Sequence, residues 1–113
     1  MTGQLHFKIA AGASLSGAWM VGNRVPVRIE MPAAWDAANL TFQTSHDGVT
    51  FQNKYDGMGA GAEFTVGAAA ARNIDLNPAD WIGVRWLKIR SGTAGTPVTQ
   101  SAARDIYLIT QEV

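Results

Sequence analysis

The sequence of 113 residues contains no cysteine, and this absence removes two kinds of stabilisation. Neither a disulfide framework nor a thiolate metal site can form, so packing alone must hold the fold together. Histidine is also scarce, with only His6 and His46 in the chain. A zinc site would therefore need carboxylates from scattered strands to complete its ligands. We expect no metal site and two solvated histidine side chains.

An excess of charge of either sign is missing as well. Nine Lys and Arg residues balance nine Asp and Glu residues, and charged residues make up 16% of the chain. Such a surface has no field that attracts phosphate backbones or anionic lipids, so we expect neither nucleic acid nor membrane as a partner. The small apolar stretch from Gly67 to Ala71 is far shorter than the ~20 residues of a membrane-spanning helix. Met1 to Gln4 do not resemble the start of a secretion signal, and synthesis in the cytoplasm is expected.

Motifs of catalysis are lacking too. The glycines at 57, 59 and 61 are followed neither by a Lys-Ser/Thr pair nor by a helical pattern, so they do not form a phosphate-binding loop. No nucleophile elbow or dinucleotide fingerprint is present, and the spacing of the carboxylates brings no two of them together. Asp47 and Asp56 lie in turn or loop contexts, where a carboxylate caps backbone amides more often than it serves catalysis or binds calcium. The sequence predicts a protein that is not an enzyme, with no catalytic residue and no cofactor.

What the chain does have is alternation of apolar and polar residues with a period of two. This pattern places successive side chains on opposite faces of a strand. Pro26 cannot donate a ladder hydrogen bond, so its strand is expected at a sheet edge or with a bulge. The apolar rows are Leu5, Phe7 and Ile9; Val25, Val27, Ile29 and Met31; Leu40 and Phe42; Val49 and Phe51; Phe64 and Val66; Ile74 and Leu76; Leu87 and Ile89; Ile106 and Leu108.

Turn signals separate these rows. Asp47 and Gly48 supply the conformations of a hairpin turn, and Asn77 before Pro78 predicts one helical turn. The segment 56–61 is too rich in glycine to hold a ladder and reads as a flexible loop, while 31–40 is either a helical turn or an irregular crossover. Roughly eight strands at the ~8–12-residue spacing of sandwiches result. We predict an all-β fold, a compact antiparallel β-sandwich of jelly-roll or discoidin-like type with one or two short helical turns, in a single domain covering residues 1–113.

The aromatic residues are the most informative about function. If Leu87 and Ile89 point into the core, Trp86 points outward on the same strand face as Lys88 and Arg90. An outward tryptophan beside cations is typical of a protein interface or a sugar-binding platform. A loop that folds over Trp86, one carrying Trp19 or Trp81, is an equally good interpretation. The candidate contact residues for a protein or a glycan are Trp86, Lys88, Arg90, Trp19, Trp81, His46 and Asp47.

About half of the chain resembles the discoidin-like, galactose-binding type of β-sandwich. In that family a strand ends in a Ser-x-Asp-Gly hairpin, as Ser45 to Gly48 do, and a later strand has an Arg-aromatic-aliphatic-x-Ile pattern, as Arg85 to Ile89 do. The resemblance implies ligand loops at one end of the sandwich, which correspond in position to His46 to Thr50 and to Gly57 to Gly61. The chain is shorter than these proteins and lacks their bridging cysteines.

Most of the chain resembles small proteins of tailed bacteriophages and prophages more closely. The shared features are a Pro-x-x-Trp connector at Pro32 to Trp35, the Asp47-Gly48 hairpin, the strand Leu87 to Gly92 and the ending Ala102 to Ile106. This resemblance implies a virion component, made in the host cytoplasm: a head decoration or cement protein, or a piece of a fibre or spike. Its implied partners are the major capsid protein or other virion proteins, and closed symmetry makes a homo-oligomer, with a trimer favoured, the expected state.

Two functions therefore compete. As a virion component, the chain would meet identical neighbours through flat edges and exposed aromatic residues. As a carbohydrate-binding module, a tryptophan would stack on a sugar of a surface glycan while polar loop residues bind its hydroxyls. A small hydrolase is a third possibility, for which the sequence offers no carboxylate pair.

Overall fold

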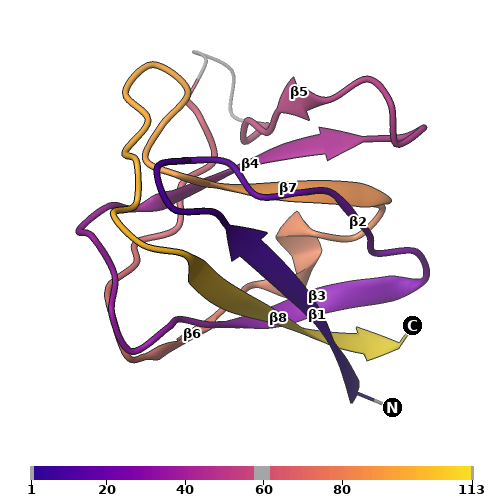
Figure 1. Cartoon of the computed structure of the whole chain (residues 1–113). Coiled ribbons are helices and arrows are strands. Elements are labelled where there is room, and N and C mark those ends of the chain that lie inside the picture. The colour runs from indigo at the N-terminus through magenta and orange to yellow at the C-terminus, as the bar shows by residue number, and fades with distance from the viewer. Residues whose placement is uncertain (1, 58–61, 113) are drawn as a thin grey trace.

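Two four-stranded antiparallel sheets face each other and form the framework of the fold (Figure 1). This computed structural model describes residues 2–57 and 62–112. The sheet that we call the β8 sheet has the order β1 (Thr2–Ile9), β8 (Arg104–Glu112), β3 (Arg24–Glu30) and β6 (Asn73–Asp75). The sheet that we call the β7 sheet has the order β2 (Trp19–Met20), β7 (Trp86–Ser91), β4 (Leu40–Ser45) and β5 (Gln52–Asn53). The predicted all-β sandwich is confirmed.

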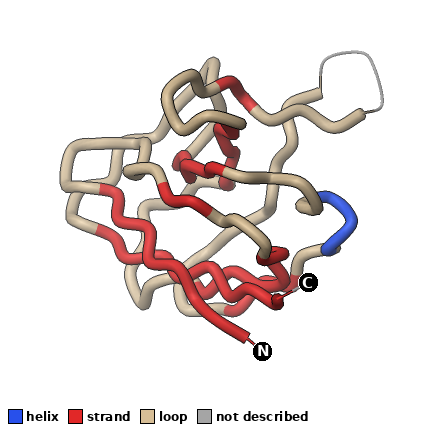
Figure 2. Tube along the Cα trace, turned by 90° about the vertical axis from the view of Figure 1, so that its right-hand side faces the viewer, coloured by secondary structure: helices blue, strands red, loops and turns tan. Residues whose placement is uncertain are grey.

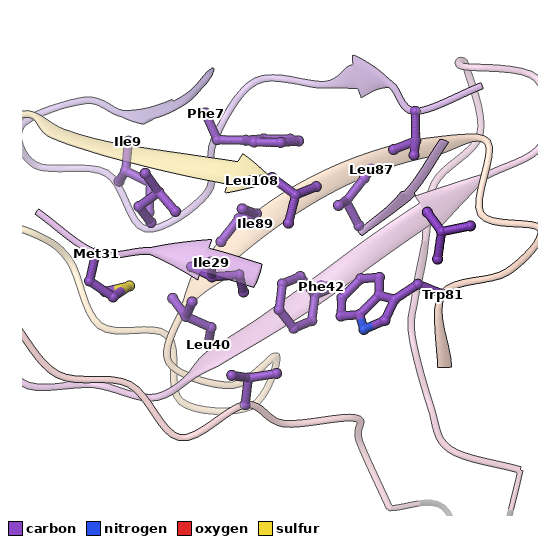
Figure 3. Packing of buried hydrophobic residues seen from close by; sticks show 14 residues of the cluster. Phe7, Ile9, Ile29, Met31, Leu40, Phe42, Trp81, Leu87, Ile89 and Leu108 are labelled. Atoms are coloured by element: carbon purple, nitrogen blue, oxygen red, sulfur yellow. The ribbon is translucent and has the colours of Figure 1, made fainter. Parts of the chain in front are cut away.

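The core lies between the sheets and takes most of its side chains from the apolar rows that the alternation predicted, with Val21 and Trp81 in addition. Phe7, Ile9 and Ile29 point inward from the β8 sheet, and Phe42 and Leu87 meet them from the β7 sheet (Figure 3). Each of these side chains is inaccessible to solvent, and burial of one such side chain contributes about 1.5–3 kcal/mol. Because the inner rows meet, the outer faces and the edges are left for contact with other molecules.

Pro26 has no backbone N–H to donate, and it lies where its strand is irregular. The register between β3 and β8 shifts between Pro26 and Arg28, which confirms the predicted bulge. On its other side β3 pairs with β6 only from Arg28 to Glu30. Pro26 therefore faces no strand on that side, although β3 as a whole lies inside its sheet and not at the edge.

The connecting segments follow the turn signals. A 3₁₀ helix at Pro78–Asp80, blue in Figure 2, begins after Asn77, whose side-chain oxygen accepts a hydrogen bond of 3.2 Å from the amide of Ala79. Residues 31–39 contain no helix and form the crossover. Within it Trp35 packs half-buried against the core and donates to the carbonyl of Ala38 at 3.0 Å. Of the predicted glycine-rich loop, Met58 to Gly61 lie outside the described residues.

Three strand predictions differ from the structure. Val49 and Phe51 belong to no strand, because β5 is limited to Gln52–Asn53, and Val49 is 82% exposed. Phe64 and Val66 form no strand, because pairing there is limited to isolated bridges, Val66 with Leu40 and Glu63 with Tyr55. Conversely, the two-residue strand β2 was not predicted. After β1 the chain crosses to the other sheet, and Ser16 accepts a 2.9 Å hydrogen bond from the amide of Ile89 through its side chain. This segment forms an irregular edge along β7, with too few paired residues to leave a periodic pattern.

Candidate functional site

Trp86 lies on the outer face of β7, as predicted, because its neighbours Leu87 and Ile89 fill the core. The indole is nevertheless half-buried. A Cβ built on Gly48 would lie 2.7 Å from an indole carbon, so the backbone of the 46–50 turn packs directly on the ring. A loop does fold over Trp86, but that loop is the hairpin turn and carries neither Trp19 nor Trp81.

Asp47 holds this turn in shape. Its Oδ1 atom accepts hydrogen bonds from the amides of Val49 and Thr50, both at 2.9 Å, and from the hydroxyl of Ser45 at 2.8 Å. Because the two backbone amides and the Ser45 hydroxyl stabilise the carboxylate, the pKa of Asp47 is well below its ordinary value. The expected capping of local amides is confirmed for Asp47, whose Oδ1 atom is held within the turn.

The Asp47 turn predicts a specific loss of stability in acid. The folded pKa is depressed, so the free energy that the carboxylate contributes is present above pH 3.8 and disappears as the pH falls below 3.8. Urea unfolding at a series of pH values should show wild type more stable than Asp47→Ala near neutrality, with the difference narrowing in acid. Asp47→Asn keeps an acceptor oxygen without the charge and serves as the control. A difference that stays constant through the acid range would contradict this assignment.

Lys88 also lies on the outer face of β7, yet it is turned toward a neighbour. Its ammonium lies 4.4 Å from the centre of the Phe51 ring, a cation–π geometry. Phe51 follows the same turn that covers Trp86. The outer face of β7 is therefore occupied by the chain's own hairpin at two of the three positions predicted to contact a partner.

Arg90, the third position, is buried, with 6% of its surface exposed, and its prediction as a contact residue is wrong. Its guanidinium donates to Glu63 at 3.0 Å, to Asn53 at 2.7 Å and to the hydroxyl of Thr41 at 3.3 Å. Glu63 in turn accepts from the amide of Ala94. Arg90 points outward from the sheet as predicted, but the segments around Glu63 and Ala94 close over it.

Trp81 is also wrongly predicted as a surface residue. It directly follows the 3₁₀ helix, is inaccessible to solvent and packs edge-on against Phe42 at 4.8 Å and against Phe64 at 5.4 Å between ring centres (Figure 3). Its indole nitrogen has no hydrogen-bond partner among residues 2–57 and 62–112. An indole in this position belongs to the core and cannot stack on a ligand.

Trp19 is the most exposed tryptophan of the predicted set, and its neighbour Met20 is exposed as well. In β2 Trp19 lies opposite Leu87 and Met20 opposite Trp86, so one side chain lies on each face of the edge. Their exposed fractions are 46% for Trp19 and 54% for Met20. We call this pair the β2 edge. The sequence analysis missed Met20, because a two-residue strand gives no alternation to place it.

His46 contributes to an open groove of about 460 Å³ at one end of the sandwich. The hairpin forms one wall and the segment after the 3₁₀ helix forms the other. Lys54 lies in this groove with its ammonium 4.2 Å from the centre of the Phe64 ring, and its partial burial lowers the pKa of the amine. The lining residues are Thr44, Ser45, His46, Thr50, Gln52, Lys54, Asp80, Ile82, Gly83, Val84 and Arg85. The sequence analysis identified the hairpin wall of this groove through His46. It contained no pattern that would bring Lys54, Asp80 and Arg85 together.

Nothing in the described part of the chain forms a metal centre. No group of three or more histidine, aspartate or glutamate side chains lies close enough to hold an ion there. Likewise, none of its helices has the length and apolar character needed to cross a membrane. Comparison of the chain with protein-family models, with curated proteins and with solved structures found no match.

Proposed function

We propose that this protein is a structural component of a tailed-bacteriophage virion, a head decoration or cement protein that attaches to capsid proteins through the β2 edge. The observation that carries the proposal is the solvent exposure of two consecutive large side chains, Trp19 and Met20, one on each face of the rim of the β7 sheet. Aromatic residues and methionine are enriched in protein–protein interfaces, and tryptophan is among the commonest anchors there.

The sequence resemblance to small phage and prophage proteins supports the same proposal. So does the near absence of net charge, nine basic against nine acidic residues, because many copies can then lie close together without mutual repulsion. Under this proposal the protein resides in the virion and its partners are the major capsid protein or other virion proteins. The trimer that closed symmetry favours stays a prediction.

Binding to capsids tests the β2 edge directly. Replacing both Trp19 and Met20 by serine is expected to weaken co-sedimentation with purified capsids of the encoding phage at least about tenfold, because two interface side chains are lost. Tyr55→Ser is the matched control: Tyr55 is 50% exposed but lies just after β5, at the opposite edge of the β7 sheet. Equal binding by wild type and the double variant, or no binding by wild type, would contradict the proposal.

A second candidate is recognition of a host-surface glycan, as part of a fibre or spike, and the groove beside the hairpin favours it. Hydroxyl, amide and charged side chains line this groove, the groups that bind sugar hydroxyls. Trp81 is buried and the hairpin turn covers Trp86, so Trp19 is the most exposed tryptophan. Trp19 is not among the residues that line the groove. This second function would be favoured if the protein bound to a glycan array and did not bind to purified capsids.

A further inference from the structure

Strand β1 differs from the other three edge strands of the sandwich. It has eight residues, whereas β6 has three and β2 and β5 have two each. Very short edge strands are one way in which proteins avoid pairing with another chain. Three of the four sheet edges are protected in this way, and the β1 edge is not.

Apart from one lysine, other protective features are also absent from β1. Its register with β8 runs without a shift from Thr2 opposite Gln111 to Ile9 opposite Arg104, so no bulge interrupts it. The strand contains no proline, and Lys8 is its one lysine or acidic residue. Every second residue of an edge strand directs its N–H and C=O away from its neighbour. Within residues 2–57 and 62–112, no segment other than β8 forms backbone hydrogen bonds with β1.

The side chains of β1 also favour an additional strand. Leu5 belongs to the inward row with Phe7 and Ile9, yet it is half-buried while they are inaccessible to solvent. A strand paired with β1 would complete the burial of Leu5. On the outer face the His6 ring stacks on Tyr107 of β8 at 4.8 Å and its Nε2 atom lies 2.7 Å from Asp105. These contacts hold the ring over β8 and away from the free edge.

We propose that β1 pairs antiparallel with β1 of a second copy of this chain across a two-fold axis, which joins two β8 sheets into one eight-stranded sheet. Residues directly opposite each other in antiparallel strands share a face, so Leu5 must lie opposite an inward residue. A register centred on Leu5 places Leu5 opposite its own copy, Gln4 opposite His6 and Thr2 opposite Lys8. A register centred on His6 would set two imidazoles against each other.

This contact and the proposed capsid attachment use different strands, β1 of the β8 sheet and β2 of the β7 sheet. The zero net charge of the chain does not oppose self-association. A two-fold pair at β1 also gives a dimer as the basic unit, in contrast to the trimer expected from the resemblance. The two states differ in mass and are therefore easily told apart.

Sedimentation equilibrium over a range of concentrations tests the dimer. Wild type should approach twice its monomer mass of 12.0 kDa, and Leu5→Lys should weaken the association at least about tenfold, since two ammonium groups would then face each other. Ile74→Lys is the matched control, because Ile74 is also a half-buried inward residue of an edge strand in the same sheet. Circular dichroism of both variants verifies the fold, and the double serine variant of the β2 edge should still dimerise.

Cross-linking determines the register, because the natural chain has no cysteine. Gln4→Cys and His6→Cys both replace exposed side chains. With a short thiol-reactive linker, a mixture of the two variants should give mixed dimers, whereas His6→Cys alone should give few. Monomeric wild type at every concentration, or equal loss of association in Leu5→Lys and Ile74→Lys, would overturn the proposal. Efficient cross-linking of His6→Cys to itself would overturn the Leu5-centred register.

Discussion

Replacing Trp81 by alanine is expected to lower the free energy of unfolding by about 3–5 kcal/mol, the cost of deleting a large aromatic side chain from a core. The indole is inaccessible to solvent and packs edge-on against both Phe42 and Phe64. Figure 3 shows it at the end of the row of inward side chains, beside Phe42. Its removal leaves a cavity that rigid strands on either side cannot fill. Urea unfolding followed by far-ultraviolet circular dichroism measures the change.

Two further variants separate packing from other effects of this substitution. Ile82→Ala changes the adjacent residue, which is 70% exposed, and should alter the free energy of unfolding by less than about 0.5 kcal/mol. Trp81→Phe keeps an aromatic ring and removes an indole nitrogen that has no partner in the described residues. It should therefore lower the free energy of unfolding clearly less than Trp81→Ala does. A Trp81→Ala variant as stable as wild type would show that Trp81 is not part of the core.

Breaking the ion pair between Arg90 and Glu63 should have an effect of similar size. Both side chains are largely removed from water: counting side-chain atoms alone, 8% of Arg90 and 15% of Glu63 is exposed. Arg90→Met leaves the Glu63 carboxylate buried without its guanidinium, which is expected to cost about 3–5 kcal/mol. Glu63 also binds the amide of Ala94, so the same variant should loosen the 92–97 loop.

A double-variant cycle tests whether the two residues act as a pair. Replacing both Arg90 and Glu63 by methionine removes both charges, and hydrophobic replacement of a buried ion pair is often neutral or stabilising. We therefore expect the double variant to be more stable than Arg90→Met in urea unfolding. Additive losses from the two single variants would instead mean that each residue acts through its other partners, Asn53 and Thr41 for the arginine and the Ala94 amide for the glutamate.

The sequence predicted correctly which strand residues point inward and which point outward. It did not predict which outward side chains are covered by other segments of the chain. Alternation assigned Leu87 and Ile89 to the core and Arg90 to the outer face, and the backbone geometry follows that assignment. It carried no information about Glu63, which lies 27 residues before Arg90 and buries it from outside. The closing of one segment over another depends on tertiary packing, which a period-two pattern does not encode.

Residues outside regular strands were harder to place. The side chain of Asn77 and the ring of Pro78 identified the 3₁₀ helix correctly, because capping is a local interaction. Trp81, one residue beyond that helix, has no alternating neighbours to show which way it points, and it was assigned to the surface. Likewise, the groove beside His46 combines Thr50 with Arg85, segments brought together only by the fold.

The two ends of the described chain lie side by side, since Thr2 is opposite Gln111 in the pairing of β1 with β8 (Figure 1). A force that pulled these ends apart would act across the ladder at its terminal rung. The hydrogen bonds between the strands would then open one after another, as in a zipper, and would not share the load. If the domain were attached through both ends, it would therefore unfold at a low force. A load applied across the sheet faces would not act on the pairing of β1 with β8.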